Sequence, residues 1–130
     1  FNQTVEDMAN GVYNCATNQF VVALTVAAPV ATNTVLANLT EIAYTNLSSR
    51  NLTTASSGQT SGTFTQLFSD LVLTASGGAV AAFRYITIYS DTPTSPADPL
   101  LCFYDFGSSL VLADGETLTI DFTTSTFTLA

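Results

Sequence analysis

The C-terminal third of the chain, residues 83–130, most constrains what this sequence can fold into. Apolar, β-branched and aromatic runs alternate there with strong turn chemistry, in the order FRYITIYSD, TPTSPADP, LLCFYDFG and SSLVLADGETLTIDFTTSTFTLA. Short runs of this composition, bounded by Pro, Gly, Asp and Ser, are typical of antiparallel strands laid down one after another. The sequence therefore predicts a mainly β fold, either an antiparallel β-sandwich or a jelly-roll-like barrel.

The whole chain, residues 1–130, is expected to form a single β domain. Its length suits one domain that buries about two-thirds of its extended surface, and 47% of its residues are hydrophobic. Within that domain we expect a short N-terminal helix or arm over residues 1–13 and a β-sandwich over residues 19–130.

The N-terminal helix is predicted from one apolar stripe. Five apolar residues recur at helical spacing, and they are Phe1, Val5, Met8, Ala9 and Val12. Asn10-Gly11 is a stop signal, so the helix should cover residues 2–10 or 2–13. Such a helix could dock as an arm on a neighbouring subunit or pack as a lid over one end of the sheet. The lid is the favoured interpretation.

Two segments before the C-terminal third also read as strands. Residues 19–27 are nearly all apolar, which predicts a strand that is covered on both faces or lies centrally in its sheet. Residues 62–75 predict one long strand, or two strands bent near Ser69-Asp70. Both segments are expected to contribute to the core.

The segment between these strands carries little pattern. It is crowded with Thr, Asn and Ser. We expect a short helical or extended piece over residues 34–43, followed by an exposed loop over residues 44–58. A short strand within that loop is expected near residues 50–54.

The strand expected at residues 83–90 has two different faces. One face would carry Phe83, Tyr85, Thr87 and Tyr89, and the other Arg84, Ile86 and Ile88. The aliphatic face is the expected core. The tyrosine-bearing face is either a second layer or an interface, because tyrosine tolerates a partly wet environment.

Turn chemistry organises the rest of the C-terminal third. Three prolines make residues 91–99 a stiff surface loop, after which residues 100–106 resume the sheet. Asp114-Gly115 is a strong hairpin signal that predicts a type I′ turn. The remaining expected strands are residues 110–112 and 117–122, which flank that turn, and an edge strand at residues 126–129.

The charge balance excludes several classes of partner. Ten acidic residues face only Arg50 and Arg84, for a net charge of -8, so nucleic-acid binding is not expected. Each arginine is expected to pair with a carboxylate, for Arg84 either across the sheet or across a subunit boundary. The sequence contains no apolar run of about 20 residues, so no membrane segment is expected, and its first residues show no signal-peptide pattern.

The sequence also contains few of the residue types that enzymes use in catalysis. The chain has no His and no Lys, so its many Ser and Thr hydroxyls lack the usual activating base. Cys15 and Cys102 show no zinc-ligand spacing, and two free thiols are favoured over a disulfide. We therefore expect a protein that is not an enzyme and that uses no cofactor or metal.

The C-terminal motifs also support a resemblance. They are R-Y-x-x-x-Y-x-D-T, a Pro-rich loop ending in P-L, Y-D-F/Y-G and G-x-x-x-T-[IV]-x-[FW], here Arg84-Tyr85, Tyr89, Asp91-Thr92, Pro99-Leu100, Tyr104-Asp105-Phe106-Gly107 and Gly115 to Phe122. In these motifs, and in FNQTVEDMANGVY and VALT near the N-terminus, the chain resembles a family of small structural proteins of tailed bacteriophages and prophages. The resemblance implies a virion component, made in the cytoplasm of the bacterial host.

Within that family the expected role is capsid decoration, as a cement protein that stabilises the head shell. The alternative is a structural module of the tail, fibre or neck, with host-receptor or glycan binding as one version of it. The expected partners are the major capsid protein or other virion proteins, and further copies of the chain in a homo-oligomer, with a trimer favoured. The candidate residues for an interface are Phe1, Val5, Arg84, Tyr85, Tyr89 and Tyr104. The candidate residues for a glycan site are Tyr44, Asp91, Tyr104 and Asp105.

Overall fold

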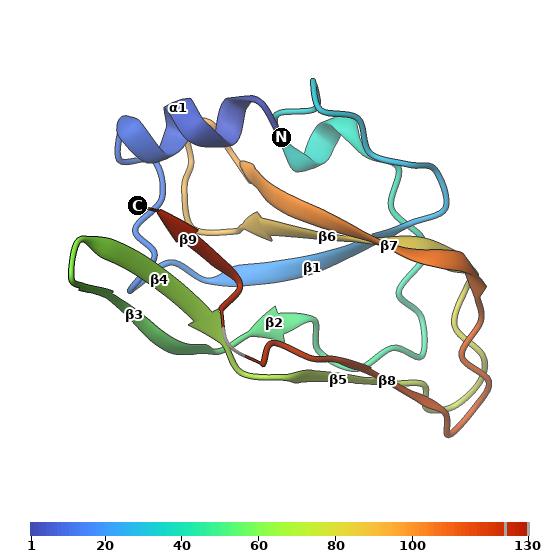
Figure 1. Cartoon of the computed structure of the whole chain (residues 1–130). Coiled ribbons are helices and arrows are strands. Elements are labelled where there is room, and N and C mark those ends of the chain that lie inside the picture. The colour runs from blue at the N-terminus through green and yellow to red at the C-terminus, as the bar shows by residue number, and fades with distance from the viewer. Residues whose placement is uncertain (124, 130) are drawn as a thin grey trace.

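Antiparallel strands and one short N-terminal helix make up the computed structural model, which describes residues 1–123 and 125–129 (Figure 1). The expected mainly β, sandwich-like fold is confirmed. The elements are α1 (Gln3–Ala9), β1 (Phe20–Thr25), the 3₁₀ turn η1 (Leu36–Asn38), β2 (Asn51–Leu52), β3 (Thr54–Thr60), β4 (Thr63–Phe68), β5 (Leu71–Thr74), β6 (Phe83–Ser90), β7 (Leu100–Leu110), β8 (Thr117–Ile120) and β9 (Phe127–Leu129).

The first layer is a four-stranded sheet in the order β2-β1-β6-β7. All six residues of β1 are buried, which confirms the prediction of a strand covered on both faces. Val22 and Leu24 point into the main core, while Val21 and Ala23 belong to a second cluster on the opposite face. The period of two along an extended strand explains this division.

The second layer consists of two smaller sheets, β3-β4-β9 and β5-β8, which lie across the main core from the first layer (Figure 1). Phe68 of β4 joins the layers, because its ring centroid lies 5.1 Å from that of Phe20 and 5.7 Å from that of Phe122. Leu73 and Ile88 are fully buried in the same core. Burial of such side chains is the main stabilising contribution to the fold.

The outer face of the four-stranded sheet is covered by α1 and η1 (Figure 1). The Thr4 hydroxyl donates to the Leu100 carbonyl oxygen at 2.8 Å, and Leu36 and Leu39 pack against Tyr89 and its neighbours. The helix therefore acts as a lid on this sheet, as favoured from the sequence. Its bounds also agree with the shorter of the two expected ranges.

Several local predictions are confirmed. The break between β4 and β5 falls at Ser69-Asp70, and residues 91–99 form a loop. The expected strand at residues 126–129 is β9, which pairs with β4. Both cysteines are unpaired.

The exposed loop expected over residues 44–58 is wrong in its second half. Thr54–Thr60 is a full strand that pairs with β4 through a tight turn at Ser61 (φ 51°) and Gly62 (φ 86°). Its side chains are all exposed or half-buried, so it carries no apolar pattern. Main-chain hydrogen bonds and the turn, rather than burial, define this strand.

The hairpin expected around Asp114-Gly115 is also wrong. The turn exists, since Glu116 N–H donates to the Ala113 carbonyl at 2.9 Å, but β8 pairs with β5 instead of with residues 110–112. The Leu112 carbonyl accepts from Val80 N–H at 2.9 Å. Only Gly115 of the two central residues has positive φ, so this is not the type I′ turn that returns a strand on its neighbour.

The residues on the two faces of β6 do not follow the simple alternation that the sequence predicts. The register against β7 shifts between Phe83, which lies opposite Leu110, and Tyr85, which lies opposite Asp105. Phe83 belongs to the main core together with Ile86, whereas Tyr89 belongs to the outer cluster. An irregularity of this kind interrupts the simple pairing of strands, and nothing in the local pattern shows where it falls.

Candidate functional site

The chain leaves one long strand at the edge of a sheet. Among the strands that the structure describes, β7 pairs only with β6, and its residues from Phe103 to Ser109 are exposed. Three of them carry large rings: Phe103, Tyr104 and Phe106, which are 37%, 41% and 46% exposed. We call this stretch, residues 102–106, the β7 edge.

An apolar groove lies beside the start of β7, where α1 and β9 approach it. Its volume is about 200 Å³, and none of the described side chains that line it is charged. Val5 is 75% exposed and Leu129 is 47% exposed. We call it the α1–β9 groove, and its lining residues are Phe1, Thr4, Val5, Met8, Leu101, Cys102, Phe127, Thr128 and Leu129.

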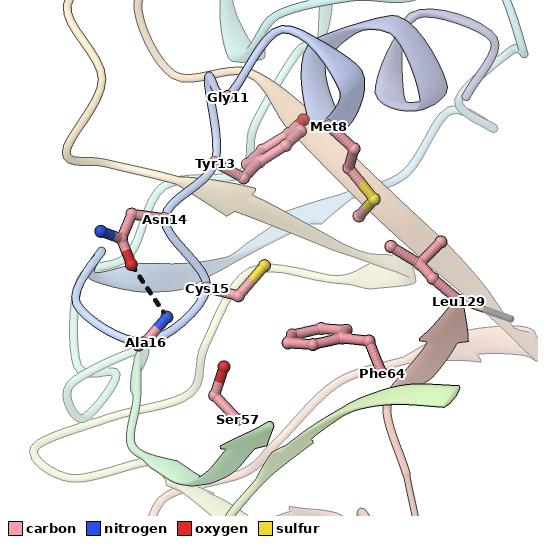
Figure 2. Close-up of a pocket in the computed structure, with 9 residues that line it drawn as sticks. All are labelled: Met8, Gly11, Tyr13, Asn14, Cys15, Ala16, Ser57, Phe64 and Leu129. Atoms are coloured by element: carbon pink, nitrogen blue, oxygen red, sulfur yellow. Dashed lines mark hydrogen bonds between the residues drawn. The ribbon is translucent and has the colours of Figure 1, made fainter. Parts of the chain in front are cut away.

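A larger cavity of about 500 Å³ adjoins this groove and shares Met8 and Leu129 with it. Figure 2 shows the Cys15 side chain near those of Phe64 and Ser57 in this cavity. Burial raises the pKa of the Cys15 thiol, which disfavours the reactive thiolate. None of the described lining residues carries a charge, so the cavity extends the apolar groove rather than adding a reactive centre.

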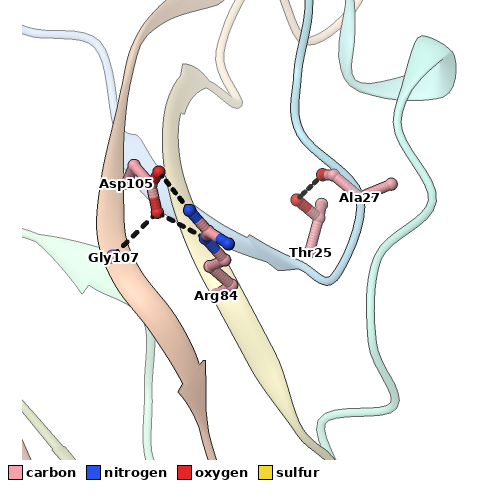
Figure 3. A network of polar contacts seen from close by, with 5 residues as sticks. All are labelled: Thr25, Ala27, Arg84, Asp105 and Gly107. Atoms are coloured by element: carbon pink, nitrogen blue, oxygen red, sulfur yellow. Dashed lines mark hydrogen bonds and ion pairs between the residues drawn. The ribbon is translucent and has the colours of Figure 1, made fainter.

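Arg84 and Asp105 form a bidentate ion pair beside the β7 edge (Figure 3). Arg84 Nε and Nη2 lie 2.7 and 2.8 Å from the two Asp105 carboxylate oxygens. This contact, together with the Gly107 N–H, holds the pKa of Asp105 at about 2. The prediction that Arg84 pairs across the sheet is confirmed, and the pair neutralises the only charge on the β7 edge.

Arg50 is engaged at the opposite edge of the same sheet. Its guanidinium lies 3.5 Å from Glu41 and stacks 3.6 Å from the centre of the Tyr44 ring, and it donates to the Val22 carbonyl. The Tyr44 hydroxyl donates to Glu41 and accepts from the Leu24 N–H at 2.9 Å. Both arginines therefore have carboxylate partners within the chain.

The residues proposed for an interface separate into three groups. Phe1 and Val5 line the α1–β9 groove, and Tyr104 lies on the β7 edge. Arg84 and Tyr85 are half-buried beside Asp105. Tyr89 is only 6% exposed, and the chain itself covers its face through residues such as Leu36 and Leu39, so this face is not a contact surface.

The residues considered for a glycan site do not converge. Tyr44 contacts β1 on one side of the four-stranded sheet, and Tyr104 and Asp105 lie on β7 at its other side. Tyr104 lines a cavity of about 360 Å³ with Ile86, Ile120 and Phe122, which neither Tyr44 nor Asp91 lines. The arrangement offers no common groove for a sugar.

Sequence reasoning missed Phe103, Phe106, Met8 and Leu129 as surface residues. The run LLCFYDF, which contains no Lys or Pro, carried a usable signal, because edge strands are commonly protected by such residues. The signal could not be read without knowing that β7 lies at an edge.

Within residues 1–123 and 125–129, no group of three or more His, Cys, Asp or Glu side chains could hold a metal ion. Across the same residues, no helix is long and apolar enough to cross a membrane.

Burial raises the pKa of the Cys102 thiol to about 11, and the thiol contacts the Tyr104 hydroxyl.

Comparisons with known proteins add no relative: no protein-family model, no curated protein and no solved structure matches this chain.

Proposed function

We propose that this chain is a structural component of a tailed-phage particle, a capsid decoration (cement) protein that stabilises the head shell rather than an enzyme. The observation that carries the proposal is the α1–β9 groove, an apolar surface lined by uncharged side chains on a molecule with a net charge of -8. Contiguous exposed apolar surface marks interaction sites, and the centres of protein interfaces are depleted in charge. The phage particle is proposed because the motifs of the C-terminal third resemble those of phage structural proteins.

The groove takes a neutral, apolar protein surface as its partner, which in this setting belongs to the major capsid protein. Val5 and Leu129 project from α1 and β9 and would be desolvated on contact. Because the contact is apolar, attachment should survive 1 M NaCl, whose Debye length of about 3 Å suppresses surface ion pairs. A tail, fibre or neck module would use the same surface, and the position of the chain in the particle separates these alternatives.

The test uses particles of the phage or prophage that encodes the chain. A low-resolution map should place the chain on the head surface, and washing with 1 M NaCl should leave it attached. The Val5→Asp variant should be retained on particles about tenfold less or worse, because it brings a charge into the apolar contact. Val26→Asp is the matched control, since Val26 is 61% exposed and does not line the groove.

The proposal fails if the chain is absent from particles, if high salt removes it completely, or if Val5→Asp binds as the unmodified chain does. A map that places the chain on the tail or neck would replace capsid decoration by the alternative role.

A further inference from the structure

On the side of the β7 edge away from β6, backbone N–H and C=O groups have no partner strand among the described residues. Leu100 N–H donates to the Thr34 carbonyl at 3.0 Å, and the Tyr13 hydroxyl donates to the Leu100 carbonyl at 2.7 Å, so the first residue of the strand is covered. From Cys102 to Phe106, the described part of the chain places no strand on the side of β7 away from β6. An unpaired row of N–H and C=O groups is a template for another strand.

The regular part of this edge, between the two register shifts against β6, carries no Lys or Pro to prevent pairing. Edge strands are commonly blunted by Lys, Pro or an unpaired charge. β7 contains neither Lys nor Pro, and Asp105 is paired with Arg84 of the neighbouring strand. The exposed rings of Phe103, Tyr104 and Phe106 make the edge apolar as well as open.

The distribution of charge around the β7 edge indicates which partner strand can bind there. A basic partner would find no unpaired carboxylate on the β7 edge, because Asp105 is neutralised by Arg84. A second copy of this acidic chain would be repelled over surfaces that carry unpaired acids, but not at this edge. An antiparallel strand pair about a two-fold axis is self-complementary, so each contact occurs twice.

We infer that a second copy of this chain pairs antiparallel along the β7 edge, residues 102–106, and joins two four-stranded sheets into one continuous sheet. The exposed rings lie on both faces of the sheet, Phe103 with its ring 5.4 Å from that of Phe1 and Tyr104 beside Ile86, and they would add apolar contact to the main-chain hydrogen bonds. The pairing is two-fold, unlike the trimer expected from the sequence. It does not depend on the proposed function, and Cys102 is the one residue that the β7 edge shares with the lining of the α1–β9 groove.

The first test is the oligomeric state of the isolated chain, measured by sedimentation velocity from low micromolar to millimolar concentration. A monomer–dimer equilibrium is expected. Phe106→Lys should raise the dissociation constant about tenfold or more, because it places two unpaired cations at the two-fold contact. Val26→Lys, an equally exposed substitution outside β7, should leave the equilibrium unchanged. Near-ultraviolet circular dichroism checks that each variant is folded, and Tyr104→Lys serves if Phe106→Lys is not.

The second test locates the contact. In a Cys15→Ala, Cys102→Ala background, single cysteines are placed at Phe103, Tyr104 and Phe106 in turn. At least one should form an intermolecular disulfide on mild oxidation, because residues near the axis face their own copies, while Val26→Cys should not. Without any substitution, hydrogen exchange of the β7 amides should slow as the concentration rises.

A monomer at every concentration, a trimer, or a dimer unaffected by both lysine variants overturns the inference. Protection of the β7 amides that appears only when particles are added would assign the edge to the shell. That outcome ends self-pairing and leaves the proposed function standing.

Discussion

At the scale of single residues, the polar side chains that matter are those that complete backbone hydrogen bonding. Tyr44 satisfies the Leu24 N–H of β1 and is itself oriented by Glu41 and Arg50. The pairing of each arginine with a carboxylate was predictable, because an isolated guanidinium in an apolar strand needs a partner. The identity of each partner was not, since Glu41 and Asp105 are brought close only by strand pairing.

Tyr44→Phe tests this contact. The substitution leaves the buried Leu24 N–H without its acceptor, so the free energy of unfolding should fall by about 1–3 kcal/mol. Urea denaturation followed by circular dichroism measures the change. Tyr85→Phe is the control and should change stability by less than about 0.5 kcal/mol, because it keeps the ring that lies 5.2 Å from the Arg84 guanidinium. Equal stability of Tyr44→Phe and the unmodified chain would contradict this role.

At the scale of elements, the predicted strands were most accurate where apolar side chains are buried. β1, β6 and β8 all show the expected buried residues, including Ile120 of β8. β3 was missed because its side chains face solvent, so its position depends on the turn at Ser61-Gly62. Both residues of that turn have positive φ, as a type I′ hairpin requires.

Gly62→Ala tests the dependence of the β3–β4 hairpin on that turn. At φ 86° an added Cβ meets no neighbouring atom, so any cost comes from the backbone conformation alone. We expect a loss of about 1–2 kcal/mol in the free energy of unfolding.

Gly58→Ala is the matched control in the same hairpin, since Gly58 lies in β3 without positive φ and with open space around it. It should leave stability unchanged or raise it by up to about 1 kcal/mol, because alanine suits a strand better than glycine. Thermal unfolding of both variants gives the comparison, and a loss of equal size in both would argue against a turn-specific effect.

At the scale of the whole molecule, a single core holds together a second layer made of two separate small sheets. Neither β3-β4-β9 nor β5-β8 is large enough to be stable alone, because two or three short strands need a packed face. Leu73 anchors β5 in that core with no exposed surface, while Val72 beside it is 50% exposed.

Leu73→Ala should therefore lower the free energy of unfolding by about 2–5 kcal/mol, through lost burial and the cavity left behind. Val72→Ala, one residue away on the opposite face, should change it by less than about 1 kcal/mol. Chemical denaturation measured by tyrosine fluorescence and by circular dichroism should give one coincident transition for Leu73→Ala. Two separate transitions would show that β5-β8 unfolds independently of the rest.

The sequence by itself determined the class of fold, the positions of α1, β1 and β4–β6, and the break at Ser69-Asp70. These follow from local rules, since periodicity and turn residues act within a few positions of each other. Tertiary structure decided that β8 pairs with β5, that Tyr89 is buried, and that β7 is left at an edge. Alternation shows which face of a strand is apolar but not which strand lies beside it, because partners distant in the chain are chosen by packing over the whole molecule.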